Sequence, residues 1–307
     1  MKARRGLDGP GDSGRWRETG ERRRNAHLED DLQELVETVE PFSIQIDPPA
    51  QDRILMFARE LIAWNERFNL LSRADAPNVI RKHVAASLGV FLVIPPTEWD
   101  RWIDVGTGAG FPGLVLKMVQ PSLDMTLVDS ARKRCLFIEN TVRSMDLGRV
   151  PVLAQRVETL LARGEAVGRF TVLTARAVAA LNETLISFGP LVAIGGRVVT
   201  FKGPQWKEEL DEAGTKGVLD QAGFTLESST RIPWTAGHLL SFRKVRLEKR
   251  EPRIRAMENA SALTGTTDAG TAMETVSQTS SSSDPVASAF GSAEPESRAE
   301  ARSDPEN

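Results

Sequence analysis

The sequence is poor in reactive sulfur, in histidine and in long apolar runs. Its 307 residues contain one cysteine, Cys135, three histidines and no tyrosine. A single cysteine excludes an intramolecular disulfide framework and a cysteine-rich zinc site, and we expect no metal. No stretch approaches the roughly 18 consecutive apolar residues of a membrane span. With 40% apolar and 26% charged residues, the composition is typical of a soluble globular protein, and we expect a cytoplasmic location.

The net charge of −3 is an average over three unlike parts. Residues 1–28 carry 8 basic and 4 acidic side chains, whereas residues 256–307 carry 2 basic and 9 acidic ones. The acidic segment is rich in Ser, Thr and Ala and has one aromatic residue, so it cannot bury enough apolar surface to offset chain entropy. We predict a disordered basic extension over 1–28, a disordered acidic tail over 256–307 and a folded part between them.

Hydrophobic spacing divides the folded part in two. Over 29–95, apolar residues recur every three or four positions, which predicts an N-terminal helical cap with a helix start at Asp47-Pro48-Pro49. Over 96–255, short apolar runs alternate with helical stretches. This alternation predicts an α/β fold whose mostly parallel sheet has helices on both faces. Strands are expected at 102–105, 125–129, 150–154, 170–174 and 196–201, helices at 112–120, 131–146, 181–192 and 205–222, and a C-terminal antiparallel hairpin at 224–231 and 238–245.

The sharpest motif is a glycine turn, residues 104–113, that reads DVGTGAGFPG. Its glycines allow a tight turn after a strand. Backbone N–H groups at the following helix start favour an anion or a carboxylate. Asp129 ends the next predicted strand, where a carboxylate can accept hydrogen bonds from ribose hydroxyls. The motif predicts a nucleotide-like cofactor.

Two cofactors fit the glycine turn. Residues 108–113 match GxGxxG, the fingerprint of dinucleotide-binding enzymes, although that match alone is weak. Asp104 lies inside the strand before the glycines, where it can orient the loop or meet the amino group of a methionine moiety. The closing hairpin is the layout of class I methyltransferases. S-adenosylmethionine is therefore favoured, and an NAD-dependent oxidoreductase is the alternative.

Two common routes of base methylation lack their residues. Methylation at carbon-5 of a pyrimidine needs a Cys nucleophile, but Cys135 lies in the helix after the second strand, away from the strand ends. Methylation of an exocyclic amine commonly uses a Pro-Pro-aromatic clamp after the fourth strand, where this chain has Thr174-Ala175-Arg176-Ala177. A ring nitrogen with a lone pair needs neither, because proximity and orientation supply much of the barrier lowering.

Short blocks of residues follow one another in a specific order over about residues 50–245. They are Trp64-Asn65, Phe68-Asn69-Leu70 with Ser72, Lys82-His83 with Ser87, the glycine turn, Leu127-Val128-Asp129-Ser130 with Lys133-Arg134, Arg156-Val157-Glu158, Ala175-Arg176-Ala177 and Phe201-Lys202-Gly203. Together these blocks resemble the bacterial glucose-inhibited division protein B family, also called ribosomal RNA small subunit methyltransferase G.

The resemblance implies a class I S-adenosylmethionine-dependent methyltransferase with a Rossmann-like fold, acting on guanine-N(7) of 16S ribosomal RNA in the small ribosomal subunit. It also implies the cofactor-binding residues. They are Gly106, Gly108, Phe111, Asp129 with Ser130 and Ala131 at the ribose, Val157 and Glu158 at the adenine, and Arg176 near the methionine end or the target base. The catalytic candidates that it implies are Arg176, His83 and Lys202.

Each catalytic candidate also has a structural interpretation: a hydrogen-bonded His83, a salt-bridged Arg176 and a solvated Lys202. Ala86 stands where the family usually has Asp, which argues against a mechanism that pairs His83 with a carboxylate there.

Phosphate contacts need cationic surface. Besides the arginine-rich N-terminus, seven basic residues between 241 and 255 are the best candidates: Arg243, Lys244, Arg246, Lys249, Arg250, Arg253 and Arg255. We expect a monomer that binds ribosomal RNA and no membrane. A methyltransferase acting on a small molecule and a non-enzymatic RNA-binding protein stay open as further alternatives.

Overall fold

A seven-stranded sheet organises the residues that the computed structural model describes, which are 27–95, 97 and 100–248. Most of the predicted basic extension, the end of the predicted catalytic domain (249–255) and the predicted acidic tail lie outside the described residues. The described chain is already helical at His27 and Leu28, so the helical part begins earlier than the boundary expected from the sequence.

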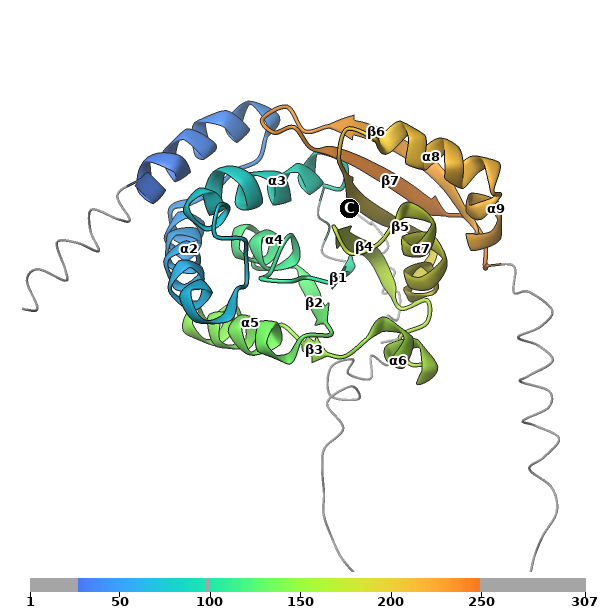
Figure 1. Cartoon of the computed structure of the whole chain (residues 1–307), viewed down its shortest axis with the longest axis horizontal. Coiled ribbons are helices and arrows are strands. Elements are labelled where there is room, and N and C mark those ends of the chain that lie inside the picture. Colours follow the sequence, from blue (N-terminus) through green and yellow to red (C-terminus); the bar gives the residue numbers. More distant parts are fainter. Residues whose placement is uncertain (1–26, 96, 98–99, 249–307) are drawn as a thin grey trace, which may run out of the picture. The chain divides into compact units, whose positions relative to one another are not determined.

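The sheet has the strand order β3-β2-β1-β4-β5-β7-β6 (Figure 1). Its strands are β1 (Arg101–Val105), β2 (Asp124–Asp129), β3 (Val152–Ala154), β4 (Phe170–Arg176), β5 (Val192–Lys202), β6 (Phe224–Arg231) and β7 (His238–Lys244). The first five strands are mutually parallel, whereas β7 is antiparallel to both β5 and β6. The parallel sheet with its antiparallel C-terminal hairpin confirms the predicted class I methyltransferase fold.

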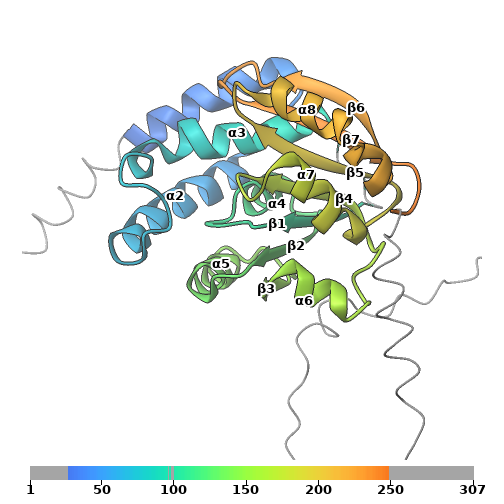
Figure 2. The same cartoon turned by 45° about the vertical axis from the view of Figure 1, so that its right-hand side comes forward.

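The path of the chain creates a crevice at the carboxyl ends of β1 and β4. From β1 the chain moves outward to β2 and β3 and then returns to the other side of β1 to form β4. The connections after β1 and β4 therefore diverge, which is where open α/β sheets bind ligands. Figure 1 shows α4 and α5 on one side of the sheet and α6 and α7 on the other, and Figure 2 shows the same elements turned by 45°.

The helices that cover the sheet are α4 (Gly113–Val119), α5 (Arg132–Ser144), α6 (Val157–Ala162), α7 (Leu181–Glu183), α8 (Trp206–Thr215) and α9 (Val218–Ala222). The cap contains a helix over residues 27–39, then α2 (Pro48–Phe68), and a helical run that includes a π-helical turn (Ile80–Val84) and α3 (Ala85–Leu88). Asp47 begins α2 as predicted, because its Oδ1 accepts a hydrogen bond from Ala50 N–H at 2.8 Å. Among the described residues, no helix is long and apolar enough to cross a membrane.

Three helical expectations were incomplete. The helix α6 was not predicted, because six residues are too few for a periodic signal. The stretch 205–222 is not one helix, because it is interrupted at Gly217, which has a φ of 65° and precedes a second helix. The stretch 181–192 is one α-helical turn followed by a π-helical turn at Thr184–Phe188 and a 3-10 turn.

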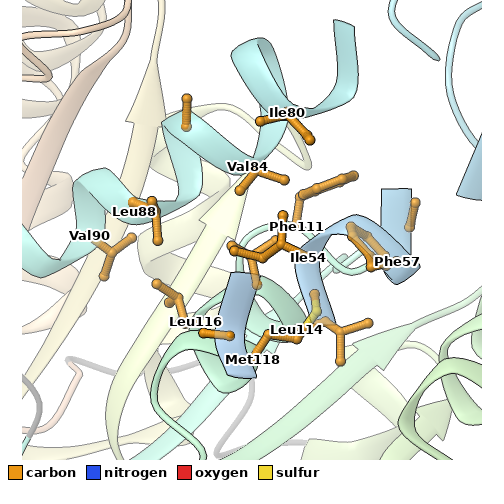
Figure 3. Packing of buried hydrophobic residues seen from close by; sticks show 14 of the residues in the cluster. Ile54, Phe57, Ile80, Val84, Leu88, Val90, Phe111, Leu114, Leu116 and Met118 are labelled. Carbon is orange, nitrogen blue, oxygen red and sulfur yellow. The ribbon is translucent and has the colours of Figure 1, made fainter. Parts of the chain in front are cut away.

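The cap and the glycine turn share one hydrophobic core (Figure 3). Phe57 on α2 is fully buried, and its ring centroid lies 5.4 Å from that of Phe111 in the turn and 6.1 Å from that of Phe137 on α5. On α3, Leu88 is buried in the same cluster. The cap thus packs directly against the glycine turn.

We expect Phe57→Ala to lower the free energy of unfolding by about 3–5 kcal/mol, because it removes a fully buried aromatic side chain and leaves a cavity. Urea denaturation followed by circular dichroism measures the loss. Leu136→Ala, at a side chain that is 48% exposed on α5, should cost less than about 1 kcal/mol. Similar costs for the two variants would contradict the shared core.

Candidate cofactor and base site

The glycine turn has a backbone that requires glycine. Gly106, Gly108 and Gly110 have φ angles of 66°, 60° and 103°, in the region that L side chains rarely adopt. At Gly106 a Cβ atom would also lie 2.4 Å from a methyl carbon of Val178. The turn therefore brings the end of β1 into contact with the loop that follows β4.

Asp104 in β1 anchors the glycine turn through hydrogen bonds. Its side chain is fully buried, and Oδ2 accepts a hydrogen bond from Gly113 N–H at 3.0 Å while Oδ1 accepts one from Thr174 Oγ1 at 2.7 Å. Burial raises the pKa of Asp104 to about 6, although these hydrogen bonds lower it. Of the two roles expected for Asp104, the structure shows loop orientation.

Asp129 joins the turn to the end of β2. Its Oδ2 accepts a hydrogen bond from Gly108 N–H at 2.9 Å, and its Oδ1 accepts one from Ala131 N–H at 2.8 Å. Arg134 Nη1 lies 3.5 Å from the same carboxylate. Because a carboxylate has about four lone-pair sites, Asp129 keeps acceptor capacity for a ligand.

A first cavity of about 330 Å³ lies beside this carboxylate. Its lining comes from the ends of β1 to β4 and comprises Val105, Gly106, Val128, Asp129, Ser130, Arg134, Gln155, Arg156, Val157, Glu158, Ala177, Val178, Ala179, Glu183 and Phe188. Four predicted cofactor residues are brought together here: Gly106, Asp129, Val157 and Glu158. Gly108 and Phe111 lie outside the lining, since Gly108 is bonded to Asp129 and Phe111 packs in the core.

A second cavity of about 450 Å³ adjoins the first. It is lined by Arg81, Lys82, Ala86, Arg176, Ala177, Phe201, Lys202, Gly203, Trp234, Thr235, Ala236 and Gly237. Ala177, which has a φ of 53°, lines both cavities.

Two residues of the second cavity, Arg81 and Trp234, were not predicted from the sequence to belong to a site. Trp234 is held by a hydrogen bond from its Nε1 to Ala85 O at 2.8 Å. This contact joins the hairpin to the cap, and no local sequence pattern predicts it.

Arg176 is the last residue of β4 and lies at the second cavity. Its Nη1 donates to His83 O at 3.3 Å, and its guanidinium carbon lies 5.5 Å from the ring centroid of Phe201. Within the described part of the chain, no carboxylate lies within ion-pair distance of Arg176, which argues against the salt-bridge interpretation. Its remaining donors are available to a ligand.

His83, in the π-helical turn of the cap, packs against the glycine turn. Its ring centroid lies 5.0 Å from that of Phe111, and among the described residues its buried Nε2 has no hydrogen-bond partner. Burial, followed by the positive charge of Arg176, lowers the pKa of His83 to about 4. The imidazole is therefore neutral at physiological pH, and Ala86, which is also buried, supplies no carboxylate to it.

Two lysines at the second cavity are already paired. The Lys202 side chain is 6% exposed, and its Nζ lies 2.7 Å from Glu209 Oε2 on α8, so it is not a solvated strand end. Lys82 Nζ lies 2.7 Å from Asp75 Oδ1. Both cations are held in fixed positions at the cavity wall.

Three of the basic residues predicted to contact phosphate, in the described part of 241–255, are already bonded within the protein. Arg243 is bonded to Glu227. Lys244 is 2% exposed and donates to Gly189 O at 2.9 Å. Arg246 donates to Asp220 O at 2.8 Å. These three cations hold the hairpin to its surroundings, whereas the remaining candidates, Lys249, Arg250, Arg253 and Arg255, lie outside the described residues.

Cys135 is buried in α5 as expected. Burial raises the pKa of its thiol to about 11, so the reactive thiolate is scarce at neutral pH. The thiol lies against Asp129 O at 3.4 Å rather than in either cavity lining. A covalent route through this cysteine is not supported.

A family model described as rRNA small subunit methyltransferase G, GidB, matches residues 50–227. The chain belongs to this family. Two relatives of the same name are 38% identical over 172 residues (Carboxydothermus hydrogenoformans) and 33% identical over 213 residues (Syntrophus aciditrophicus). These matches cover 56% and 68% of this chain and 73% and 87% of the relatives.

Among solved structures, an S-adenosylmethionine-dependent methyltransferase from Aquifex aeolicus matches with a TM-score of 0.41 and 16% identity. The match covers 56% of this chain and 96% of that chain. The family assignment itself leaves the NAD-dependent oxidoreductase and the small-molecule methyltransferase without support.

The lowered pKa of His83 predicts a pH dependence of stability. Above pH 6.5 the neutral ring is favoured in both the folded and the unfolded chain. Between pH 6.5 and about 4 the unfolded chain binds the extra proton, so stability is lost as the pH falls.

From pH 7 to pH 5 this term amounts to about 2 kcal/mol. We expect His83→Gln to lose about 2 kcal/mol less of its free energy of unfolding over that range than the wild type does. Urea titrations at both pH values measure the difference. Parallel losses in the two proteins would show that His83 titrates normally.

Proposed function

We propose that the chain transfers the methyl group of S-adenosylmethionine to guanine-N(7) of 16S ribosomal RNA in the small ribosomal subunit, acting as a cytoplasmic monomer. The observation that supports this proposal is the pair of cavities that meet at Ala177, at the carboxyl ends of β1 and β4. The first cavity has acidic residues for hydroxyl and amino groups. The second has fixed cations and aromatic rings, which suit a nucleotide.

The residues of the first cavity fit S-adenosylmethionine. Asp129 has acceptor capacity for ribose hydroxyls, and Val157 and Glu158 begin α6, where they offer an apolar surface and a carboxylate to the adenine. Gly106 lines the same cavity on the side of the glycine turn, and we assign the methionine end to that side. When bound, the cofactor supplies an electrophilic methyl group on a sulfonium.

The residues of the second cavity fit a guanine. In its neutral form this base presents N7 and O6 as adjacent acceptors. Arg176 and Lys202 carry only donors, so a hydrogen bond from either to O6 orients the base while the lone pair of N7 stays free. Guanine N7 carries no proton, so its attack on the methyl group requires no base. We therefore assign no proton transfer to His83. We assign Arg176 to base orientation and direct in-line transfer to the chemistry.

The deciding experiment supplies labelled S-adenosylmethionine and small ribosomal subunits from a strain without this modification, and then maps 7-methylguanine in the 16S RNA. We expect one modified guanine. Subunits that already carry the modification are the control and should accept no label. No product under conditions in which a family relative is active would contradict the proposal.

We expect Arg176→Lys to reduce kcat/KM for small subunits by about 100-fold, because lysine loses the planar fork that orients the base and small misplacements are costly. Arg67→Lys, in the last turn of α2, is the control and should retain wild-type activity. Steady-state kinetics with saturating cofactor provide the measurement. A loss within about threefold would contradict an orienting role for Arg176.

A further inference from the structure

We propose that Trp206 and His238, with Lys207 and Arg231 beside them, form a platform that holds an unpaired nucleotide flanking the target guanine. This platform, defined by these four residues, rests on the proposed function. The platform lies at the edge of the second cavity that faces α8 and the hairpin. In this proposal, that edge binds an RNA nucleotide next to the reacting base.

The two rings of the platform are stacked. Their centroids lie 4.1 Å apart, and the interplanar angle is 9°. Both side chains are half-buried, so the pair is neither core nor fully solvated. His238 Nε2 lies 2.7 Å from Ser229 Oγ, which fixes the orientation of the imidazole. Burial and the charge of Lys207 lower the pKa of His238 and favour its neutral ring.

The register of the sheet places this pair at the rim of the second cavity. Lys202 on β5 lies opposite His238 on β7, which lies opposite Arg231 on β6. Residues directly opposite one another project from the same face of a sheet. Trp206 N–H donates to Gly203 O at 3.3 Å, and Gly237 directly precedes His238. Gly203, Gly237 and Lys202 all line the second cavity.

The platform also carries two cations that form no ion pair with the described residues. Lys207 Nζ lies 5.6 Å from the ring centroid of Trp206, and both Lys207 and Arg231 are exposed. Within the described part of the chain, neither forms an ion pair, in contrast to Lys202 and Lys82. Two unpaired cations beside an aromatic stack match the phosphates on either side of a base.

RNA chemistry identifies the occupant. Unpaired bases stack on aromatic side chains, and nearby cations contact their phosphates. An enzyme that acts on a base takes it out of its stack, so the neighbouring nucleotide loses a stacking partner. The Trp206–His238 pair offers a replacement surface next to the cavity proposed for the guanine.

The first test compares Trp206→Leu with Trp206→Phe. Leucine retains apolar bulk but has no aromatic face, so we expect it to raise KM for unmethylated small subunits about tenfold while the affinity for S-adenosylmethionine stays unchanged. Phenylalanine should restore KM to within about threefold of the wild type, which loss of packing alone would not predict. Calorimetry with S-adenosylmethionine shows that each variant is folded.

The second test needs no change in the half-buried rings. Lys207→Ala and Arg231→Ala should each reduce the slope of log affinity for small subunits against log salt by about one. Lys216→Ala is the matched control on the same segment, because its ammonium is already paired with Glu212, and it should not change the slope.

Three outcomes separate the hypotheses. If the wild type does not methylate small subunits, the proposed function fails. If it does, and Trp206→Leu leaves KM within about twofold, the platform is overturned. If Trp206→Leu does not fold, unchanged salt slopes for both cation variants overturn it.

Discussion

The site depends on one buried carboxylate. Asp104 is fully buried in the central strand, and its two oxygens accept hydrogen bonds from Gly113 N–H in the turn and from the Thr174 hydroxyl on the adjacent strand. Burial of an unbonded carboxylate would cost several kcal/mol, so the turn and β4 are held at the positions that satisfy it. The relative placement of both cavities follows from this constraint, since each is built on a loop that leaves β1 or β4.

The cap adds a second constraint from the opposite side of the turn. Phe57 packs on Phe111, and Trp234 of the hairpin connection donates to Ala85 O on the cap. The helices before the sheet therefore contact both the turn and the hairpin. They form a wall of the second cavity through Arg81 and Lys82 rather than a separate body.

The sheet and the glycine turn could be predicted because their signals are local. The glycine turn after the first strand and the carboxylate at the end of the second lie within about 25 residues of chain, and they predict one side of the first cavity. The rest of its lining extends as far as Phe188. Helix α6 was not predicted because it is only six residues long, too short for a periodic pattern of apolar residues. The internal bonds of the basic C-terminal segment could not be predicted, because the partners Glu227, Gly189 and Asp220 are 16, 55 and 26 residues away in the chain. The wall formed by Arg81 and Trp234 likewise depends on tertiary contacts that no spacing encodes.

The junction at Ala177 has a kinetic consequence. Among the described residues, it is the one that lines both cavities, and the two linings otherwise come from different segments. In the proposed function, the methyl group passes from one ligand to the other beside this alanine. Its small side chain lets the reacting atoms approach each other, and the rate of transfer depends on that approach.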